Sequence, residues 1–427
     1  MKEFFRGIVA SVLAFLSRAI LRKYKPKIVM VTGSVGKTST KDAVAAALSS
    51  RFHLRASEKS YNSEFGVPLT VIGVKNPWLN PLAWLSVFEE ALALIFLPSH
   101  YPKLLVLEVG ADRPGDLARI LRIATPDAVV VTQLPDVPVH VEAYASPEAV
   151  REEEFAPAYA LSPGAPLILC ADDENAKRLA SRLSVSVRTY GLAKDANVRF
   201  SNVGTYEEES GLAGMEAEAK ADGNVFTLKA SGVLGRQQIY APAAALALAL
   251  SMGLLLEEAL QGLANYEPPA GRARILPGVN GSTLIDDTYN ASPTATEEIL
   301  RSLAMVKSKE RVVVILGDML ELGRYSVEEH ARVGKTAAET ADLIVGVGLR
   351  ARAMVEAAQE AGKRDALHFD DSREAAKALP DLVRKGDLVL IKGSQSIRME
   401  RITEALLRDS QDVSRLVRQE KEWKAKG

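Results

Sequence analysis

The sequence predicts an α/β protein with mostly parallel sheets, arranged in two successive units. Three observations carry this prediction. From Lys27 onward, short apolar runs alternate with helix-like segments, which is the pattern of buried strands joined by crossover helices. One run leads into the glycine-rich stretch TGSVGKT at 32–38, and a helix-like segment follows it. A cluster of proline and glycine, PPAGRARIL at 268–276, then separates a helix from a new strand and marks a linker.

Length and composition are those of an ordinary globular protein. The 427 residues suffice for two or three domains, and 47% hydrophobic with 25% charged residues is typical of a soluble fold. The net charge of -1 gives no field that favours nucleic acid or an acidic partner. Cys170 is the sole cysteine, so the chain can form neither an internal disulfide nor a zinc site with several cysteines, which fits a reducing cytoplasm.

Residues 1–24 are predicted to form an amphipathic helix. Residues 1–27 carry seven lysines and arginines against one acid, Glu3. The apolar run at 8–16 is shorter than the about 20 residues that a spanning helix needs, and no small-residue cleavage site follows it. Two interpretations remain open: a helix packed on the protein body, or a basic helix lying as a peripheral contact on the inner face of the cell membrane.

The central domain is predicted to cover residues 25–267. Continuous apolar runs predict buried strands at 27–32, 104–110, 128–134 and 166–173. Helices are expected over 38–49 and over the alanine- and leucine-rich segment 243–255, and 194–230 alternates like an antiparallel β excursion.

The C-terminal domain is predicted to cover residues 268–410. Its apolar runs predict strands within 282–290, 311–318, 342–348 and 387–393, each followed by a turn at α/β spacing. The remaining segment, 411–427, is a charged tail, and we expect its last part, QEKEWKAKG at 419–427, to fray.

The loop after the first strand is the most specific chemical signal. A strand that leads through glycines into a helix places backbone N–H groups around a phosphate. Lys37 would reach the β and γ phosphates, and the Thr38 hydroxyl would bind Mg²⁺. The alternative is an ordinary βα turn that contains glycine. The candidate nucleotide-binding residues of the loop are Gly33, Ser34, Gly36, Lys37, Thr38 and Ser39.

Glu108 ends the predicted strand at 104–110, in the stretch LEVGADRPGD. Open α/β sheets bind their ligands at the carboxyl ends of parallel strands, where a carboxylate can hold Mg²⁺ beside a triphosphate. A buried structural glutamate is the alternative interpretation. The stretch YNSEFGVPLT, which contains Asn62, is a further polar loop that could line the same site.

The chain resembles the Mur ligase family in six stretches, which are TGSVGKTSTKD, YNSEFGVPLT, LEVGADRPGD, DDTYNASPTA, LGDMLELGRYSVEEH and LIKGSQSIRME. The resemblance extends from about Lys27 to about Ile402 and is strongest to the members that add D-alanyl-D-alanine. It implies a central P-loop ATPase-type domain followed by a Rossmann-like α/β domain. It also implies ATP and Mg²⁺ as cofactors, an acyl phosphate made from a muramoyl-tripeptide-type carboxylate, and attack by an amine to form an amide bond in peptidoglycan precursor synthesis.

The resemblance also implies roles for individual residues. Thr38, Glu108 and His140 become metal-site candidates, and His140 with Glu108 and Lys37 becomes a catalytic candidate. The nucleotide-side candidates of the second domain and linker are Arg272, Asp287 and Asn290, and the substrate-side candidates are Asn62, Lys392, Ser394 and Arg398. For the last three, solvated charges and polar groups at a helix start are the alternative.

The chain departs from the family pattern at four places. The ATP loop begins at residue 32, so we expect that the family's N-terminal UDP-binding domain is absent. Glutamates stand at 152–154 where the family has a lysine that is carbamylated in use, and we expect Glu154 to supply that metal-binding carboxylate directly. A solvated acidic first turn is the alternative. Gln237, Gln238 and Ala241 replace residues on the adenine side, and Gln133 replaces an asparagine.

These departures leave two other functions in play. One is a ligase of the same family that acts on a smaller or lipid-linked acceptor. The other is a nucleotide-dependent regulatory protein with weak ATPase activity. The expected partners are small molecules, with no nucleic acid, and the expected state is a cytoplasmic monomer.

Overall fold

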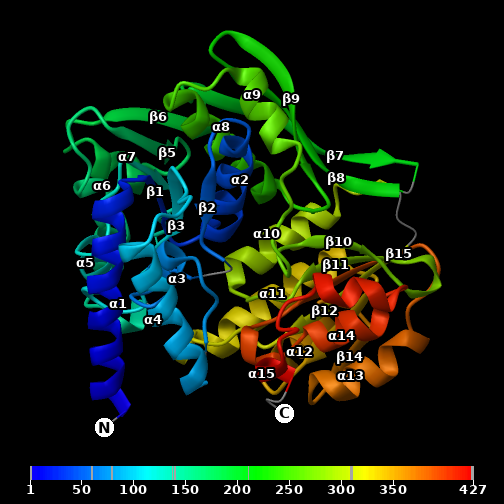
Figure 1. The fold of residues 1–427 in the computed structure, drawn as a ribbon. Coiled ribbons are helices and arrows are strands. Elements are labelled where there is room, and N and C mark those ends of the chain that lie inside the picture. Colours follow the sequence, from blue (N-terminus) through cyan, green and yellow to red (C-terminus); the bar gives the residue numbers. More distant parts are fainter. Residues whose placement is uncertain are drawn as a thin grey trace. The chain divides into compact units, whose positions relative to one another are not determined.

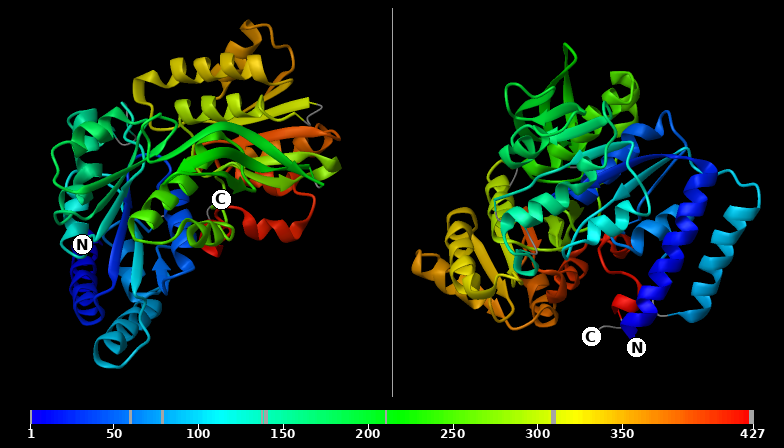
Figure 2. Two further views of the ribbon diagram at one scale, coloured as in Figure 1. Left: turned by 90° about the horizontal axis from the view of Figure 1, so that it is seen from above. Right: turned by 90° about the vertical axis from the view of Figure 1, so that its left-hand side faces the viewer.

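Two α/β units with mostly parallel sheets make up the protein, as the sequence predicts. The computed structural model describes residues 2–58, 61–77, 80–136, 138, 141–209, 211–307 and 311–424. The first unit comprises Met1–Ser201, Glu218–Leu228 and Tyr240–Glu267, and the second comprises Asn202–Ala217, Lys229–Ile239 and Pro268–Gly427. Figure 1 labels their helices and strands, and Figure 2 gives two further views.

Strand β1 (Lys27–Thr32) lies inside a nine-stranded sheet and pairs in parallel with β3 (Leu104–Glu108) and β4 (Ala128–Val131). The strand order is β2-β3-β1-β4-β5-β6-β7-β8-β9. The other strands are β2 (Leu54–Ala56), β5 (Pro166–Cys170), β6 (Ser186–Gly191), β7 (Val198–Glu208), β8 (Gly211–Ala221) and β9 (Asn224–Ser231). Because β1, β3 and β4 are parallel neighbours, their carboxyl ends share the sheet edge from which the glycine-rich loop departs.

Helices cover this sheet. Helix α2 (Lys37–Ser49) packs against α8 (Tyr240–Ser251) and α9 (Leu256–Leu263). Helix α8 is apolar on all sides because it is almost entirely buried. The remaining helices of the first unit are α1 (Lys2–Tyr24), α3 (Gly66–Ile72), α4 (Pro81–Phe96), α5 (Asp116–Leu121), α6 (Pro147–Tyr159) and α7 (Glu174–Ala180).

Helix α1 packs against α3 and α4 along one side (Figure 1). Leu13 and Ile20 are fully buried in the core that also contains β1 and β3. This accounts for one face of the amphipathic helix. Within the described residues, no helix is both long enough and apolar enough to cross a bilayer.

The sheet of the second unit has six strands in the order β10-β11-β15-β12-β13-β14, all parallel except for the β10–β11 pair. The strands are β10 (Arg274–Pro277), β11 (Thr283–Asp287), β12 (Arg311–Gly317), β13 (Leu343–Val347), β14 (Ala366–Phe369) and β15 (Asp387–Lys392). The helices are α10 (Pro293–Leu303), α11 (Ser326–Thr340), α12 (Arg352–Glu360), α13 (Ser372–Ala378), α14 (Glu400–Leu406) and α15 (Lys421–Lys424).

The part of the charged tail that precedes residue 419 is anchored in the second unit. Leu416 and Val417 are buried, and Arg418 is only 7% exposed. The Arg418 guanidinium donates to Oε2 of Glu400 (2.9 Å) and to the Thr288 carbonyl. Two buried apolar side chains and the bonds of one buried guanidinium therefore fix a segment whose composition is mainly charged.

Candidate active site

The loop between β1 and α2 is shaped to surround an anion with backbone N–H groups. Gly33 and Gly36 adopt φ of 117° and 83°, a region that residues with a Cβ rarely enter. Gly36 is the N-cap residue of α2, and a glycine offers no side chain to cap the first-turn N–H groups. The Ser34 N–H donates to the Gln133 carbonyl (2.8 Å), which ties the loop to the segment after β4. A helix N-terminus that follows such a turn is a site for phosphate.

The Lys37 ammonium lies against this loop. Its Nζ donates to the Gly33 carbonyl and lies 3.9 Å from Oε1 of Glu154. The side chain is 15% exposed, so a ligand can still reach the ammonium. Lys37 is therefore placed where an incoming phosphate would replace oxygen partners that the protein itself supplies.

Glu154 points toward the loop from helix α6. It is 2% exposed, and Ser34 Oγ donates to its carboxylate. Thr32 Oγ1 donates to the Glu154 carbonyl (2.6 Å), which fixes the backbone of α6 beside the end of β1. Glu154 is the last of three consecutive glutamates, and the structure places it beside the glycine-rich loop.

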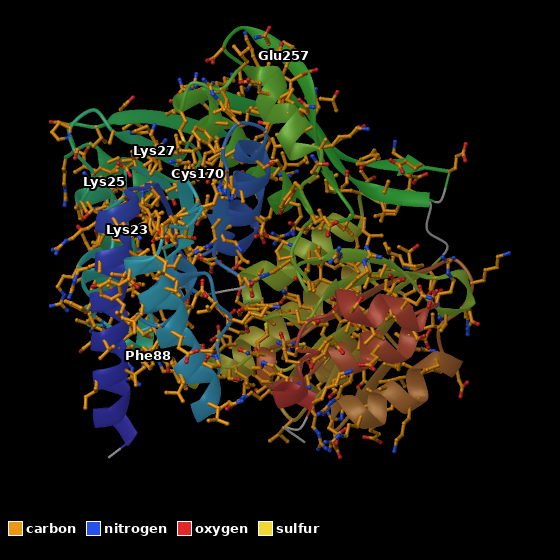
Figure 3. All side chains as sticks on the ribbon, in the orientation of Figure 1. Lys23, Lys25, Lys27, Phe88, Cys170 and Glu257 are labelled. Atoms are coloured by element: carbon orange, nitrogen blue, oxygen red, sulfur yellow. The ribbon has the colours of Figure 1, made fainter. Side chains whose placement is uncertain are left out.

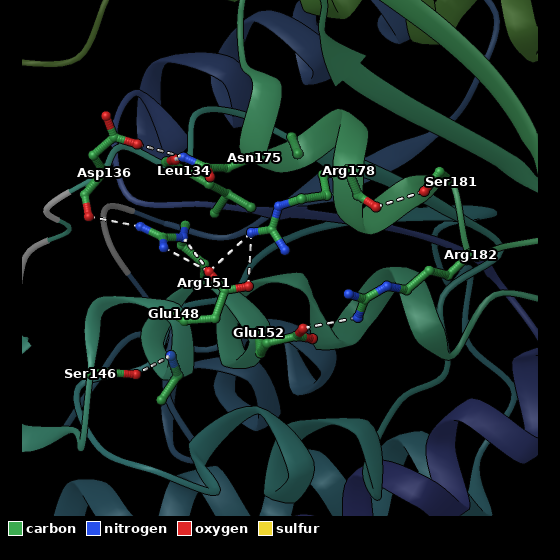
Figure 4. A network of polar contacts seen from close by, with 12 residues as sticks. Leu134, Asp136, Ser146, Glu148, Arg151, Glu152, Asn175, Arg178, Ser181 and Arg182 are labelled. Atoms are coloured by element: carbon green, nitrogen blue, oxygen red, sulfur yellow. Dashed lines mark hydrogen bonds and ion pairs between the residues drawn. The ribbon is translucent and has the colours of Figure 1, made fainter.

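The two neighbouring glutamates have other partners. Oε1 of Glu153 accepts from the N–H groups of Gly115 (3.1 Å) and Leu117 (3.0 Å), at the start of α5. Oε1 of Glu152 pairs with Arg182 (3.2 Å), as Figure 4 shows. The acidic run at 152–154 is therefore not a uniformly solvated first turn.

A polar network holds α6 in place (Figure 4). Ser146 caps the helix by accepting from the Ala149 N–H (3.2 Å). Glu148 accepts from Arg151 and from Arg178 of α7, at 2.6 and 2.8 Å. Arg151 also donates to the Asp136 carbonyl (2.7 Å). These contacts fix the helix that carries Glu154, so that its carboxylate stays at the loop.

Glu108 and Asn62 lie at the same edge of the sheet. Glu108 pairs in register with Val31 and is 1% exposed. The Gly110 N–H donates to the Asn62 carbonyl (3.1 Å). A Cβ on Gly110 would lie 3.1 Å from Asn62 Nδ2 and 3.4 Å from Lys37 Cε, so glycine allows these two side chains to approach β3 closely.

The oxygen donors at this edge fit Mg²⁺. The Thr38 hydroxyl and the Glu108 and Glu154 carboxylates are hard ligands, and all three residues are buried. His140 lies outside the described residues. Within the described part of the chain, no three histidine, cysteine, aspartate or glutamate side chains gather closely enough to hold an ion. An ion here would therefore need phosphate oxygens or waters as well, which is the usual state of protein-bound Mg²⁺.

A second cluster of predicted residues forms in the second unit. Asp287 and Lys392 are paired in register at the carboxyl ends of β11 and β15. Lys392 Nζ donates to Oδ2 of Asp287 (2.7 Å) and to the Asn290 carbonyl (2.9 Å). The Arg272 guanidinium lies 4.0 Å from the centre of the Tyr289 ring. The structure thus joins Asp287, Asn290 and Lys392 by direct contacts and places Arg272 against the neighbouring Tyr289.

Ser394 and Arg398 are engaged inside the second unit. Ser394 Oγ accepts from the Leu320 N–H (2.9 Å). The Arg398 guanidinium pairs with Glu400 and donates to the Trp423 carbonyl (3.0 Å), and the residue is 8% exposed. Substrate contact by these two residues stays a prediction, because each already has a protein partner.

Sequence reasoning assigned no role to the residues that hold this unit's loops. His330 ends the LGDMLELG motif region and is fully buried. Its Nε2 accepts from the Met319 N–H (3.0 Å), and its Nδ1–H donates to the Ser326 carbonyl (2.6 Å). Burial lowers the pKa of His330, so the imidazole is neutral when it accepts this bond. The sequence signal for His330 is its fixed spacing after the LGDMLELG motif. For Arg418, which lies in a charged tail, no such signal exists.

The residues that depart from the family pattern on the adenine side also have partners within the second unit. Gln237 Nε2 donates to Oε2 of Glu298 (2.8 Å), and Gln238 Nε2 donates to the Arg272 carbonyl (3.3 Å). These amides help to hold the linker residue Arg272.

Comparison with known proteins identifies the family. Two family models match the chain, the Mur ligase middle domain over residues 31–249 and the Mur ligase glutamate ligase domain over residues 271–395. The chain is 26% identical over 394 residues to UDP-N-acetylmuramoyl-tripeptide--D-alanyl-D-alanine ligase of Bacillus subtilis, a match that covers 92% of this chain and 78% of that protein. The protein of the same name from Escherichia coli is 27% identical over 410 residues, with 92% and 80% covered.

A solved structure leads to the same family. The structure of MurF ligase from Thermotoga maritima in complex with ADP matches with a TM-score of 0.75 at 26% sequence identity, and the match covers 93% of this chain and 83% of that one. The middle-domain match alone spans more than half of the chain, and so the protein belongs to the Mur ligase family.

Proposed function

We propose that this protein is an ATP-dependent ligase that joins D-alanyl-D-alanine to the carboxyl group of a muramoyl tripeptide, a step of peptidoglycan precursor synthesis. Relatives that match 92% of the chain carry this activity in their names. The observation that carries the proposal is the meeting of Lys37 and Glu154 at the glycine-rich loop, with Glu108 on the neighbouring strand.

The reaction has two steps. An oxygen of the acceptor carboxylate attacks the γ-phosphorus of ATP, the bond to ADP breaks, and an acyl phosphate forms. The amine then attacks the acyl carbon, phosphate leaves with the bonding electrons, and the amine loses a proton to form the amide. Negative charge develops on the phosphoryl oxygens, where the loop N–H groups and Lys37 are preorganised to stabilise it. Neither step needs a nucleophilic side chain.

Magnesium, when bound, would neutralise phosphate charge and orient the phosphates. We assign Thr38, Glu108, His140 and Glu154 as the residues that would hold it. Glu154 takes the place of the lysine that other family members carbamylate, and a carbamate on a lysine is likewise a carboxylate. Burial of Glu154 and its ties to Ser34 and Lys37 support this assignment, because a glutamate on a solvated helix turn would have neither.

Three variants test the role of Glu154. Glu154→Gln keeps the shape and removes the charge, and we expect ADP release to fall about 100-fold and its Mg²⁺ dependence to change. Glu154→Lys is expected to regain turnover only when bicarbonate is added, since carbamylation restores a carboxylate. Glu152→Gln, in the same acidic run but paired with Arg182, is the matched control and should keep its turnover. Glu154→Gln with unchanged turnover and unchanged Mg²⁺ dependence would overturn the assignment.

The remaining assignments follow the domain boundaries of the sequence analysis. We assign the ATP-binding ligase domain to residues 25–267 and the C-terminal ligase domain to residues 268–410. The proposed nucleotide contacts of the second unit and linker are Arg272, Asp287 and Asn290, and the proposed substrate contacts are Asn62, Lys392, Ser394 and Arg398. We also propose a cytoplasmic monomer that acts on small molecules and binds no nucleic acid.

The decisive experiment measures ADP release from the full chain against a panel of carboxylate acceptors and amines. The proposal expects release that requires both UDP-N-acetylmuramoyl tripeptide and D-alanyl-D-alanine. Release that requires a smaller or lipid-linked carboxylate would replace the acceptor in this proposal and keep the ligase chemistry. Equal release without any acceptor would overturn the proposal in favour of a regulatory ATPase.

A further inference from the structure

Helix α1 is anchored firmly on one side. Leu13, Ser17 and Ile20 are fully buried against the body of the first unit. At the end of the helix, Lys23 Nζ donates to the Leu94 carbonyl (2.8 Å) and to the Leu97 carbonyl (2.6 Å) at the end of α4, and the Tyr24 hydroxyl also donates to the Leu94 carbonyl (2.8 Å). These bonds hold the ends of α1 and α4 together. The opposite side of each helix therefore keeps a fixed orientation toward solvent.

That solvent side is apolar on both helices. Seventeen large apolar side chains are well exposed among the described residues, and eight of them belong to α1, α4 and the residue that ends α4. They are Ile8, Val12 and Phe15 on α1, and Leu82, Leu85, Leu92, Phe96 and Leu97 on α4, and we call them the two-helix face. The right-hand view of Figure 2 shows the two helices next to each other at the surface. Because so many of the exposed apolar side chains lie on two contacting helices, they indicate an interaction surface and not isolated surface residues.

The charges around the two-helix face are mainly positive. No aspartate or glutamate occurs from residue 4 to residue 41. Arg22, Lys23, Lys25 and Lys27 are exposed at the end of α1, and Figure 3 labels the three lysines there. The opposing charges on α4 are two, Glu89 and Glu90. This is a local excess of positive charge in a chain whose net charge is -1.

We propose that the two-helix face binds peripherally to the surface of an anionic lipid bilayer. An amphipathic helix with apolar residues on one side and lysine and arginine beside them lies in the interface of such a bilayer. The exposed Phe15, Leu85 and Phe96 would enter the boundary between headgroups and acyl chains, and the basic residues at the end of α1 would meet anionic headgroups. The contact is peripheral because no described helix can span the bilayer.

Charge favours a lipid surface over a second copy of the chain. An isologous dimer would bring the basic ends of two α1 helices to the same interface, where few acids lie beside them, namely Glu89 and Glu90 of α4 and Asp127, which accepts from the Ile28 N–H (2.8 Å). A bilayer containing anionic lipid offers a continuous negative surface to the same residues.

The experiment uses the full chain in sedimentation with vesicles of phosphatidylcholine alone, or of phosphatidylcholine and phosphatidylglycerol in equal amounts. We expect binding to the anionic vesicles only, weakening as salt rises. Arg22→Gln combined with Lys25→Gln should lower the partition coefficient about fivefold for each charge removed, which corresponds to about 1 kcal/mol per charge. Phe15→Asp should abolish measurable binding.

Leu255→Asp is the matched control, because Leu255 is 65% exposed, Phe15 is 64% exposed, and aspartate is favoured at the N-cap position that Leu255 occupies in α9. It should bind like the unaltered protein. Thermal unfolding and ADP release of all variants report whether each one is folded. Absence of binding by the unaltered protein, or equal binding by Phe15→Asp and Leu255→Asp, would overturn the proposal. So would a dimer in light scattering that Phe15→Asp dissociates, since the face would then pair copies of the chain.

Discussion

Replacing Asp286 by asparagine should stabilise the second unit at neutral and alkaline pH. Asp286 is fully buried in β11, and its Oδ1 accepts from the hydroxyls of Thr288 (2.7 Å) and Thr403 (3.1 Å). Among the described residues, its Oδ2 has no hydrogen-bond partner. Burial raises the pKa of this carboxyl to about 6, with Asp287 adding to the effect and Arg418 opposing it. The buried charge is therefore an energetic cost whenever the group is ionised.

The size of the effect follows from the pKa. The pKa of the Asp286 carboxyl is 3.8 in the unfolded chain and about 6 in the fold. A rise of roughly two units at about 1.4 kcal/mol each makes the folded state lose about 3 kcal/mol as pH rises through this window. This loss of folding free energy is absent below the pKa of the unfolded chain and complete above the pKa of the folded chain. Asp286→Asn keeps an oxygen for both threonines but leaves its amide nitrogen without a partner, which costs about 1 kcal/mol at every pH.

The net expectation is a gain of about 2 kcal/mol at about pH 8 and a loss of about 1 kcal/mol at about pH 3, which is below the unfolded pKa. Hydrogen exchange read by mass spectrometry on peptides from β11 and β15 measures the opening free energy of this unit without assuming that the whole chain unfolds in one step. Asp387→Asn is the control. Asp387 is buried on neighbouring β15 but fully paired with Arg311 (2.6 Å), so that change should destabilise by about 3 kcal/mol at about pH 8. A difference between Asp286→Asn and the unaltered protein that does not vary with pH would refute the reasoning.

Three further predictions concern single residues. Lys37→Met should lower kcat for ADP release about 100-fold or more, measured at saturating ATP, while the thermal unfolding temperature stays close to that of the unaltered protein. Burial lowers the pKa of His330 below 6.5, so the unfolded chain takes up a proton at a higher pH than the folded chain does. The free energy of unfolding should therefore fall as the pH drops below about 6.5. His330→Asn should remove this part of the pH dependence, measured by thermal unfolding. Arg418→Ala leaves Oε2 of Glu400 and the Thr288 carbonyl without this donor, while Arg398 still pairs with Oε1, and should cost about 2 kcal/mol in urea unfolding. A value near zero would mean that the tail does not support the Thr288 loop.

Much of the fold could be predicted because buried parallel strands leave a plain pattern. The first strand was expected at 27–32 and is found at Lys27–Thr32. The predicted strands at 104–110 and 128–134 end earlier, at Glu108 and Val131, because the last residues of each run already form the loops at the sheet edge. An apolar run indicates that a segment is buried, and burial continues past the end of the strand into the loop that lines the site.

The candidate site was predictable where a residue type is tied to a fixed spacing. Lys37 follows its glycines in the chain, and Glu108 ends a strand, so both positions can be read from the sequence. The partners of Ser394 and Arg398 could not be read in this way. Leu320 and Trp423 reach them from distant segments, and a local pattern contains no information on such contacts.

The arrangement around Lys37 suggests how the loop is kept ready for nucleotide. A lysine on a bare loop would lose side-chain entropy when a phosphate arrived, up to about 2 kcal/mol. Here the Gly33 carbonyl and the Glu154 carboxylate already hold the ammonium in place. Binding of a phosphate then exchanges one set of oxygens for another and orders little that was mobile, which is the physical content of preorganisation. On the proposed function, the same exchange would release the Glu154 carboxylate from Lys37 as the triphosphate arrives, so that the carboxylate could hold the accompanying cation.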